Sequence, residues 1–370
     1  MADTPGGADP ATDEIFDVEK PQELPAHRRR RGFLARHLVG VIVSGFVIVV
    51  LVVIGVGWLW YSSAESGSPG SGVVVNVASG DSFTAIRSEL IKTGVVRSGL
   101  ALDFYVLVHG TPDVQPGQYY LQKNDPFGDV IGILNNPPNV LDLEVPSGFT
   151  VSEISERMES AGYDTLSTDF QTLATSGKVR SPFEPAGSKN LDGLLGAGSY
   201  QILPVESANQ VLENMIESFT KTAAAAGLTP GTTLNGLDAY QVVTLASIVE
   251  KEGYIQKNMT KVSRVIYNRL TDGMPLQMDS TILYSLGQDG GTVTPADLQI
   301  KSPYNTYLNT GLTPTPICLP STHALDAALH PADGKWLYFV VVEQDGTEAF
   351  SDTYAGQVAN EKLAEQRGLG

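Results

Sequence analysis

A run of 24 uncharged residues, from Leu38 to Tyr61, most constrains what this chain can fold into. As an α-helix with a rise of 1.5 Å per residue, the run would be about 36 Å long, enough to cross a hydrocarbon core of roughly 30 Å. Trp58, Trp60 and Tyr61 stand at its end, and aromatic rings favour the membrane interface. The sequence therefore predicts one membrane-spanning helix over residues 38–61.

Five arginines, at positions 28–31 and 36, stand directly before this run. Basic residues remain on the cytoplasmic side of a membrane, so we expect a cytoplasmic N-terminus and an extracytoplasmic remainder in a single-pass protein of the cell membrane. A cleaved signal peptide is the alternative. It is disfavoured because the apolar run is longer than a typical signal core and no compact small-residue cleavage site follows it.

The segments on either side of the run are poor in large apolar residues. Residues 1–27 are rich in Pro, Asp and Glu, and the whole stretch 1–37 is expected to form a disordered cytoplasmic tail. Residues 62–72 are rich in Ser and Gly and are expected to form a flexible linker.

The charge and the cysteine content exclude several classes of protein. The net charge of −17 disfavours a nucleic-acid partner, which would require a basic surface. One cysteine, Cys318, excludes an internal disulfide and a cysteine-rich zinc site. His323 and His330 stand near Asp326, but their spacing matches no metal motif, so we expect neither a metal nor another cofactor.

Two stretches 68 residues apart share one pattern. Each predicts a short strand, a turn at Gly80 or Gly148, a Ser or Thr helix cap, and a helix of about three turns that ends at a second glycine. Apolar residues recur at the same offsets, as Ile86 with Leu90 and as Ile154 with Met158. A repeated strand–helix unit is more typical of a small binding module than of an enzyme, although turn, cap and helix are also common by chance.

The stretch LASIVEKEG, residues 245–253, reads as the end of an apolar helix that starts near Gln241. Glu252 stands seven residues, about two turns, after Leu245 and therefore lies on the apolar face, whereas Glu250 lies on the other side. Desolvation of a carboxyl raises its pKa and suits it to general acid catalysis. The alternative is that the helix frays at Gly253 and that Glu252 turns into water.

A second polar residue lies on an apolar face in the next predicted helix. Arg269 stands seven residues after Val262 and shares its face, and Asn268 is its neighbour. A buried arginine needs an anionic or carbonyl partner. A structural ion pair, with Asp279 as the candidate partner, is favoured over direct catalysis by Arg269. Polar residues on the apolar faces of two successive helices nevertheless suggest a polar cleft that Arg269 shares with Glu252.

Polar and aromatic residues follow on predicted loops, in LQMDST (residues 276–281) and SPYNTY (residues 302–307). Amides, hydroxyls and aromatic faces are the groups that carbohydrate sites use. A buried strand from Trp336 to Val342 is predicted to form a hairpin with Glu348 to Ser351.

These motifs together, with the NRL at residues 268–270 and ALHPADGKWLYFV at residues 328–340, resemble the YceG-like endolytic murein transglycosylase family. The resemblance covers about residues 73–370. It implies an α+β fold, in which a LysM-like glycan-binding region over residues 73–180 is followed by an α+β catalytic domain over residues 181–370. It also assigns the catalytic acid to the second glutamate of the E-K-E sequence, which is Glu252. The expected substrate-binding residues are Asn268, Arg269, Gln277, Asp279, Tyr304 and Asn305.

The chain departs from the family pattern between Asp192 and Tyr200, where the expected aromatic residues and proline are missing. The resemblance implies a lyase that cleaves β-1,4 bonds between N-acetylmuramic acid and N-acetylglucosamine within glycan strands and leaves 1,6-anhydro ends, thereby ending strand elongation. Peptidoglycan strands and the membrane are then the partners, with cell-wall synthases as a further candidate. A hydrolytic muramidase with Asp279 as second carboxylate and a non-catalytic glycan-binding scaffold are the alternatives.

Overall fold

The computed structural model describes residues 31–65, 67–253 and 255–369. Of the expected disordered tail of residues 1–37, residues 1–30 lie outside the described residues, whereas residues 31–37 are helical and the prediction is wrong for them. The chain divides into two compact units, which meet between Ala64 and Glu65.

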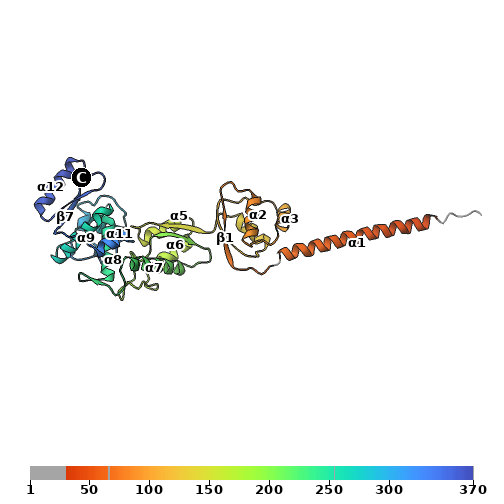
Figure 1. Cartoon of the computed structure of the whole chain (residues 1–370), viewed down its shortest axis with the longest axis horizontal. Coiled ribbons are helices and arrows are strands. Elements are labelled where there is room, and N and C mark those ends of the chain that lie inside the picture. Colours follow the sequence, from red (N-terminus) through yellow and green to blue (C-terminus); the bar gives the residue numbers. More distant parts are fainter. Residues whose placement is uncertain (1–30, 66, 254, 370) are drawn as a thin grey trace, which may run out of the picture. The chain divides into compact units, whose positions relative to one another are not determined.

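Helix α1 (Arg31–Glu65) belongs to the first unit except for its last residue, and Figure 1 draws it as one uninterrupted ribbon. Within the described part of the chain, its stretch His37–Glu65 is the one helix that is long and apolar enough to cross a membrane. Its apolar side chains are exposed, as for Phe46 at 69%. The helix begins earlier and ends later than the predicted span of 38–61, so residues 62–65 are helical and do not belong to a flexible linker.

The second unit begins with two segments of the same local structure. In the first, β1 (Gly72–Val77) and β2 (Gly117–Gln122) form an antiparallel pair, and α2 (Phe83–Lys92) and α3 (Gly99–His109) lie between them in sequence. In the second, β3 (Leu141–Val145) and β4 (Gly198–Ile202) pair in the same way around α5 (Val151–Ser160) and α6 (Asp164–Ala174). Helix α4 (Phe127–Leu134) lies between the two segments in sequence.

The details of the repeat also match. Gly80 and Gly148 have φ of 89° and 85°, in the left-handed region that a glycine adopts without strain. Ser82 caps α2 and Thr150 caps α5, in each case by accepting a hydrogen bond from a backbone N–H in the first turn. The predicted apolar pairs are buried, with Ile86, Leu90, Ile154 and Met158 at most 4% exposed.

The boundary expected at residue 180 falls inside the second of these segments, because its last strand, β4, starts at Gly198. Residues of β3, α5 and β4, such as Leu143, Ile154 and Ile202, belong to the same hydrophobic core as the helices further along the chain. In the structure the second copy of the repeat is therefore part of the body that contains LASIVEKEG.

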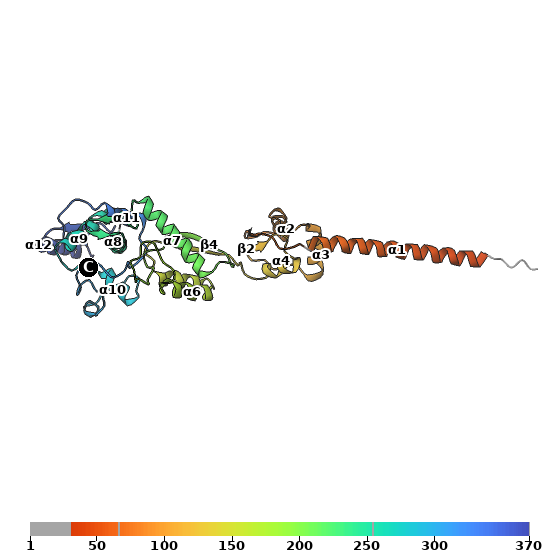
Figure 2. The ribbon, with the colours of Figure 1, turned by 90° about the horizontal axis from the view of Figure 1, so that it is seen from below.

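That body is built on helices. Helix α7 (Ala208–Ala225) packs against α6, and α8 (Ala239–Glu252), α9 (Gln256–Thr271) and α11 (Thr322–Leu329) pack on one another, as Figure 2 shows. Every residue of α8 from Val242 to Val249 is buried, so α8 is the central helix of the core. The remaining elements are β5 (Thr233–Leu234), β6 (Leu237–Asp238), α10 (Asp279–Leu286), the 3-10 helix η1 (Asp297–Gln299), β7 (Tyr338–Val341), β8 (Glu348–Ser351) and α12 (Tyr354–Gln366).

The predicted hairpin is confirmed, since β7 pairs antiparallel with β8. Helix α12 packs on this hairpin. The described residues thus form a mixed α and β structure with one apolar N-terminal helix and small two-stranded sheets.

Candidate active site

Helix α8 carries Glu252 as its last residue. The helix begins with a reciprocal cap between Asp238 and Gln241, and it ends at Gly253. A side chain at Gly253 would place its Cβ 2.7 Å from the side chain of Met259 and 2.9 Å from the carbonyl oxygen of Val249. Glycine at this position therefore allows the end of α8 to approach Met259 of α9 closely.

Glu252 is partly buried, and its Oε1 accepts a hydrogen bond of 3.2 Å from the backbone N–H of Ser280. Burial raises the pKa of its carboxyl, the hydrogen bonds from Ser280 oppose this, and the negative charge of Asp279 adds to the rise. The net pKa is above that of an ordinary glutamate. This is the direction that general acid catalysis near neutral pH requires.

Glu250 lies on the other side of α8, as the helical spacing predicts. Its Oε2 accepts a hydrogen bond of 2.9 Å from the backbone N–H of Ser321, which caps helix α11. The two glutamates of the E-K-E sequence therefore differ in function, because Glu250 joins two helices while Glu252 faces the cavities.

Two cavities meet at Glu252. The larger has a volume of about 670 Å³ and extends from Glu252 toward the start of α5. The smaller has a volume of about 340 Å³ and extends toward β7 and α12. Glu252 and Asp279 line both of them, so the carboxyl of Glu252 stands where two hollows of ligand-binding size adjoin.

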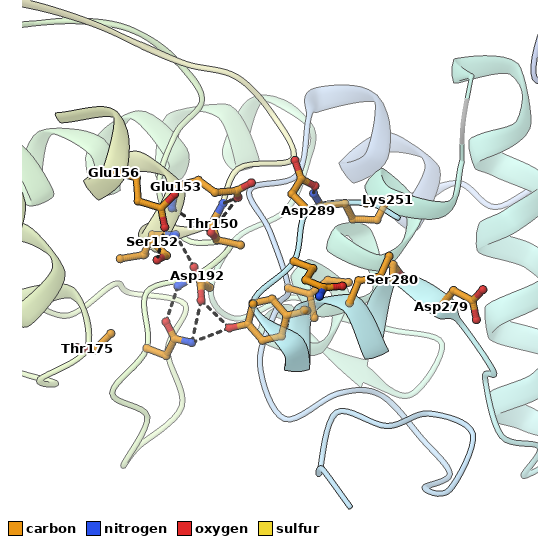
Figure 3. A pocket seen from close by; sticks show the side chains of 18 of the residues that line it. Thr150, Ser152, Glu153, Glu156, Thr175, Asp192, Lys251, Asp279, Ser280 and Asp289 are labelled. Carbon is orange, nitrogen blue, oxygen red and sulfur yellow. Dashed lines mark hydrogen bonds and ion pairs between the residues drawn. The ribbon is translucent and has the colours of Figure 1, made fainter. Parts of the chain in front are cut away.

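Asp192 organises one wall of the larger cavity, as Figure 3 shows. Its Oδ1 accepts a hydrogen bond of 2.7 Å from the backbone N–H of Val151, in the first turn of α5. Its Oδ2 accepts bonds of 2.6 Å from the hydroxyl of Tyr284 and 3.0 Å from the amide of Asn190. The stretch that departs from the family pattern thus still supplies an ordered cavity wall, while Leu194 and Leu195 fill the core behind it.

An ion pair lies at the rim of the same cavity. Nζ of Lys251 lies 2.5 Å from Oδ1 of Asp289, on the loop that follows α10 (Figure 3). Burial lowers the pKa of Lys251, but the hydrogen bond and charge of Asp289 outweigh that effect and raise it. Lys251 is therefore protonated, and it partly compensates the carboxylates of this cavity.

Arg269 is 6% exposed, as its position on the apolar face predicts, but its partners differ from the expected one. It donates to the carbonyl oxygens of Leu337 at 2.6 Å and of Leu276 at 2.5 Å, and its guanidinium lies over the ring of Tyr338. The expected ion pair with Asp279 is wrong, since no such pair forms among the described residues. Arg269 still lines the smaller cavity, and its charge acts on Glu252.

Gln277 and Asp279 are exposed and line the smaller cavity. Asp279 accepts a hydrogen bond of 2.6 Å from the hydroxyl of Tyr307. Gln277 has a φ of 50°, in the left-handed region that non-glycine residues rarely adopt. Strained residues of this kind cluster at functional sites.

The other three expected substrate-binding residues have internal partners and line neither cavity. Asn268 donates to the carbonyl oxygens of Gly334 and Trp336. Asn305 is fully buried, and its amide makes four hydrogen bonds to the backbone of its own loop and of the preceding segment. Tyr304 donates or accepts a bond with Thr315 and packs against Tyr284. We therefore interpret these three as residues that shape the loops around the site.

Several residues that line the cavities were not among the expected site residues. Ser280 and Lys251 could have been inferred from their neighbours, because Ser280 follows the expected Asp279 directly and Lys251 stands inside the E-K-E sequence. Tyr284 and Asp289 follow Asp279 on helix α10 and on the loop after it, whereas Glu153 comes from a distant segment that only the tertiary structure brings to the cavity. Among the described residues, no three His, Cys, Asp or Glu side chains come together as a possible metal site.

Comparison with known proteins indicates a family for this chain. The model of the YceG-like family matches residues 75–362. An endolytic murein transglycosylase of Bacillus subtilis is 31% identical over 297 residues, which cover 76% of this chain and 81% of that protein. One of Streptococcus pneumoniae is 28% identical over 309 residues, which cover 74% of this chain and 55% of that protein.

A crystal structure of a YceG-like protein from Listeria monocytogenes superposes with a TM-score of 0.52 at 26% identity, over 78% of this chain and 99% of that one. The fold and the site thus define a mixed α and β protein with a partly buried glutamate between two cavities. The chain belongs to the YceG-like family, which confirms the resemblance of its motifs.

Proposed function

We propose that this chain is an endolytic murein transglycosylase, a lyase in which Glu252 is the catalytic acid and base. The observation that carries the proposal is the position of Glu252, whose carboxyl has a raised pKa and lies where two cavities adjoin. The names of the relatives from Bacillus subtilis and Streptococcus pneumoniae support the same activity.

In this mechanism protonated Glu252 gives its proton to the glycosidic oxygen between N-acetylmuramic acid and N-acetylglucosamine. The bond from C1 of the muramyl unit to that oxygen breaks, and the N-acetylglucosamine unit leaves as an alcohol. The carboxylate then takes the proton of the muramyl C6 hydroxyl, whose oxygen attacks C1 to close the 1,6-anhydro ring. Because Glu252 ends protonated, one enzymic carboxyl completes the cycle without a second nucleophile.

The cavities on either side of Glu252 suit a cut within a strand, because sugar units must then be bound on both sides of the broken bond. General acid catalysis contributes only about 10²- to 10⁴-fold, so substrate positioning and polar stabilisation must supply the rest. We assign these roles to Asp279, Gln277 and Arg269, which line the smaller cavity.

A hydrolytic muramidase is the competing proposal, because Asp279 also lines both cavities and could activate water. The hydroxyl of Tyr307 donates a hydrogen bond to Asp279 and thereby orients its carboxyl toward the cavities. The products distinguish the two reactions, since an anhydro end is one water lighter than a reducing end.

The further parts of the proposal concern location. The apolar helix α1 is compatible with a single-pass membrane anchor, and the arginines before it favour a cytoplasmic N-terminus with the site outside. We propose that the segment from residue 73 contributes LysM-like glycan binding and that the enzyme ends the elongation of nascent strands, next to cell-wall synthases.

The test is digestion of peptidoglycan glycan strands by the full-length chain in detergent, followed by mass spectrometry of the ends. We expect 1,6-anhydro ends from the wild type and none from Glu252→Gln. Glu250→Gln is the matched control on the same helix and should retain activity. Reducing ends would support the muramidase, and wild-type activity of Glu252→Gln would favour a different catalytic group. A chain that binds but never cleaves would support the scaffold.

A further inference from the structure

The smaller cavity is rich in aromatic side chains. Tyr307, Tyr338, Phe339 and Tyr354 contribute to its lining, together with Glu252 from the proposed catalytic site. Its volume of about 340 Å³ is near the lower end for ligand sites, which suits one sugar ring at a time. Aromatic faces pack well against the C–H surface of a pyranose because both are weakly polar and flat.

Tyr354 is the most accessible of these rings. It is 68% exposed although it is a large aromatic residue, and it packs against Tyr338 in an edge-to-face arrangement with ring centroids 6.1 Å apart and an interplanar angle of 62°. Tyr338 in turn lies under the guanidinium of Arg269. The ring of Tyr354 is thus supported on one side while much of its surface remains open to solvent.

The backbone around Tyr354 is held firmly. Thr353 caps α12 by accepting a hydrogen bond from the backbone N–H of Gly356. Gln357 is 8% exposed and donates to the carbonyl oxygen of Phe339 in β7. A Cβ at Gly356 would come within 2.2 Å of the hydroxyl of Ser351, so the glycine allows α12 to approach β8 closely. The tyrosine at the start of α12 is therefore preorganised relative to the cavity.

We propose that Tyr354 is a stacking platform for an N-acetylated amino sugar on the side of the scissile bond away from the larger cavity. The inference rests on the proposed function for the direction of the strand, and it assigns a binding role to the C-terminal hairpin and helix. Tyr354 acts by binding and orienting the strand, and the proton transfers remain with Glu252.

The test measures binding separately from cleavage. Full-length chain carrying Glu252→Gln is kept in detergent, and its dissociation constant is measured by fluorescence anisotropy with labelled, peptide-free strands of alternating N-acetylglucosamine and N-acetylmuramic acid. Adding Tyr354→Ala should weaken binding about tenfold, whereas Tyr354→Phe should stay within about twofold, because the ring is retained. Val358→Ala is the matched control, since Val358 is 43% exposed on the same helix and does not line the cavity.

In the active chain, Tyr354→Ala should raise KM by a similar factor and leave kcat nearly unchanged, as expected when an interaction is made equally in ground and transition states. Unchanged affinity of a folded Tyr354→Ala variant would overturn the inference. An equal loss of affinity in Val358→Ala would also overturn it, as would a Glu252→Gln chain that binds no strand. If the wild type forms no anhydro ends and Tyr354→Ala still weakens binding, the proposed function fails and the platform stands.

Discussion

The backbone N–H of Ser280 donates to Oε1 of Glu252, and this bond of 3.2 Å joins the last residue of α8 to the first turn of α10. The N-terminal end of a helix favours a negative charge, so α10 stabilises the carboxylate form. Burial and the charge of Asp279 favour the protonated form and prevail. Opposing effects thus act on the carboxyl of Glu252, which suits the proposed role, in which it releases a proton and then accepts one.

The first prediction concerns the pH dependence of cleavage. Since Glu252 must be protonated to donate, kcat/KM should fall as pH rises through its raised pKa, at a pH above the value of about 4.3 for an ordinary glutamate. Rates of anhydro-end formation measured across a pH series show this decrease in kcat/KM directly. A rate that keeps rising from neutral into alkaline solution would contradict the role of Glu252 as the acid.

The second prediction concerns stability. A raised pKa means that the folded chain binds the proton of Glu252 more tightly than the unfolded chain does, so this group lowers the free energy of unfolding as pH rises from about 4.3 through the folded pKa. In Glu252→Gln this decrease in the free energy of unfolding with rising pH is absent, because glutamine does not titrate. The melting temperature of this variant relative to wild type should therefore increase with pH and then level off. Thermal unfolding from acidic to neutral pH checks this, and a difference independent of pH would refute it.

The third prediction separates strain from binding at Gln277, whose φ is 50°. A left-handed conformation costs a non-glycine residue about 1–2 kcal/mol, and substitution by glycine relieves this strain. Part of the stability so gained is lost again, because glycine has greater conformational freedom in the unfolded chain. The free energy of unfolding of Gln277→Gly should thus equal that of the wild type or exceed it by up to about 1 kcal/mol. That of Gln277→Ala should not increase, because alanine has the same strain as glutamine in this conformation.

Both substitutions at Gln277 should weaken strand binding if the amide contacts the sugar. Denaturant unfolding and the binding assay are run on the same samples. Full affinity in both variants would remove Gln277 from the substrate-binding residues.

The fourth prediction tests the structural role of Asn305, which makes four hydrogen bonds while fully buried. Asn305→Ala should lower the free energy of unfolding by about 2–4 kcal/mol, because buried backbone groups lose their partners. Leu308→Ala, at a 51% exposed position of the same loop, should have little effect. Denaturant unfolding measures both. A stable Asn305→Ala chain with an increased KM would instead restore Asn305 as a substrate contact.

Much of the local structure followed from spacing in the sequence. The seven-residue interval between Leu245 and Glu252 was enough to place Glu252 away from Glu250, because helical periodicity is a local property. The strand, cap and helix of each repeat copy were also predictable, since glycine turns and Ser or Thr caps depend on neighbouring residues.

Partners across long stretches of chain were not predictable in this way. The burial of Arg269 was foreseen, but its partner at Leu337 lies 68 residues away. A polar group satisfied by backbone carbonyls leaves no complementary side chain in the sequence to indicate the pairing. Asp192 and Tyr284 are two side chains that lie 92 residues apart in the sequence, and only the tertiary structure brings them into hydrogen-bonding contact.

The three hydrogen bonds to Asp192 have a mechanical consequence for the larger cavity. The carboxyl of Asp192 joins the first turn of α5, the segment at Asn190 and the tyrosine of α10, so separating these walls would leave a buried polar group without its hydrogen-bond partners. At the rim of the same cavity, by contrast, Asp289 stands between Gly287 and Gly290, whose φ angles of 67° and 86° are ones that glycine adopts without strain.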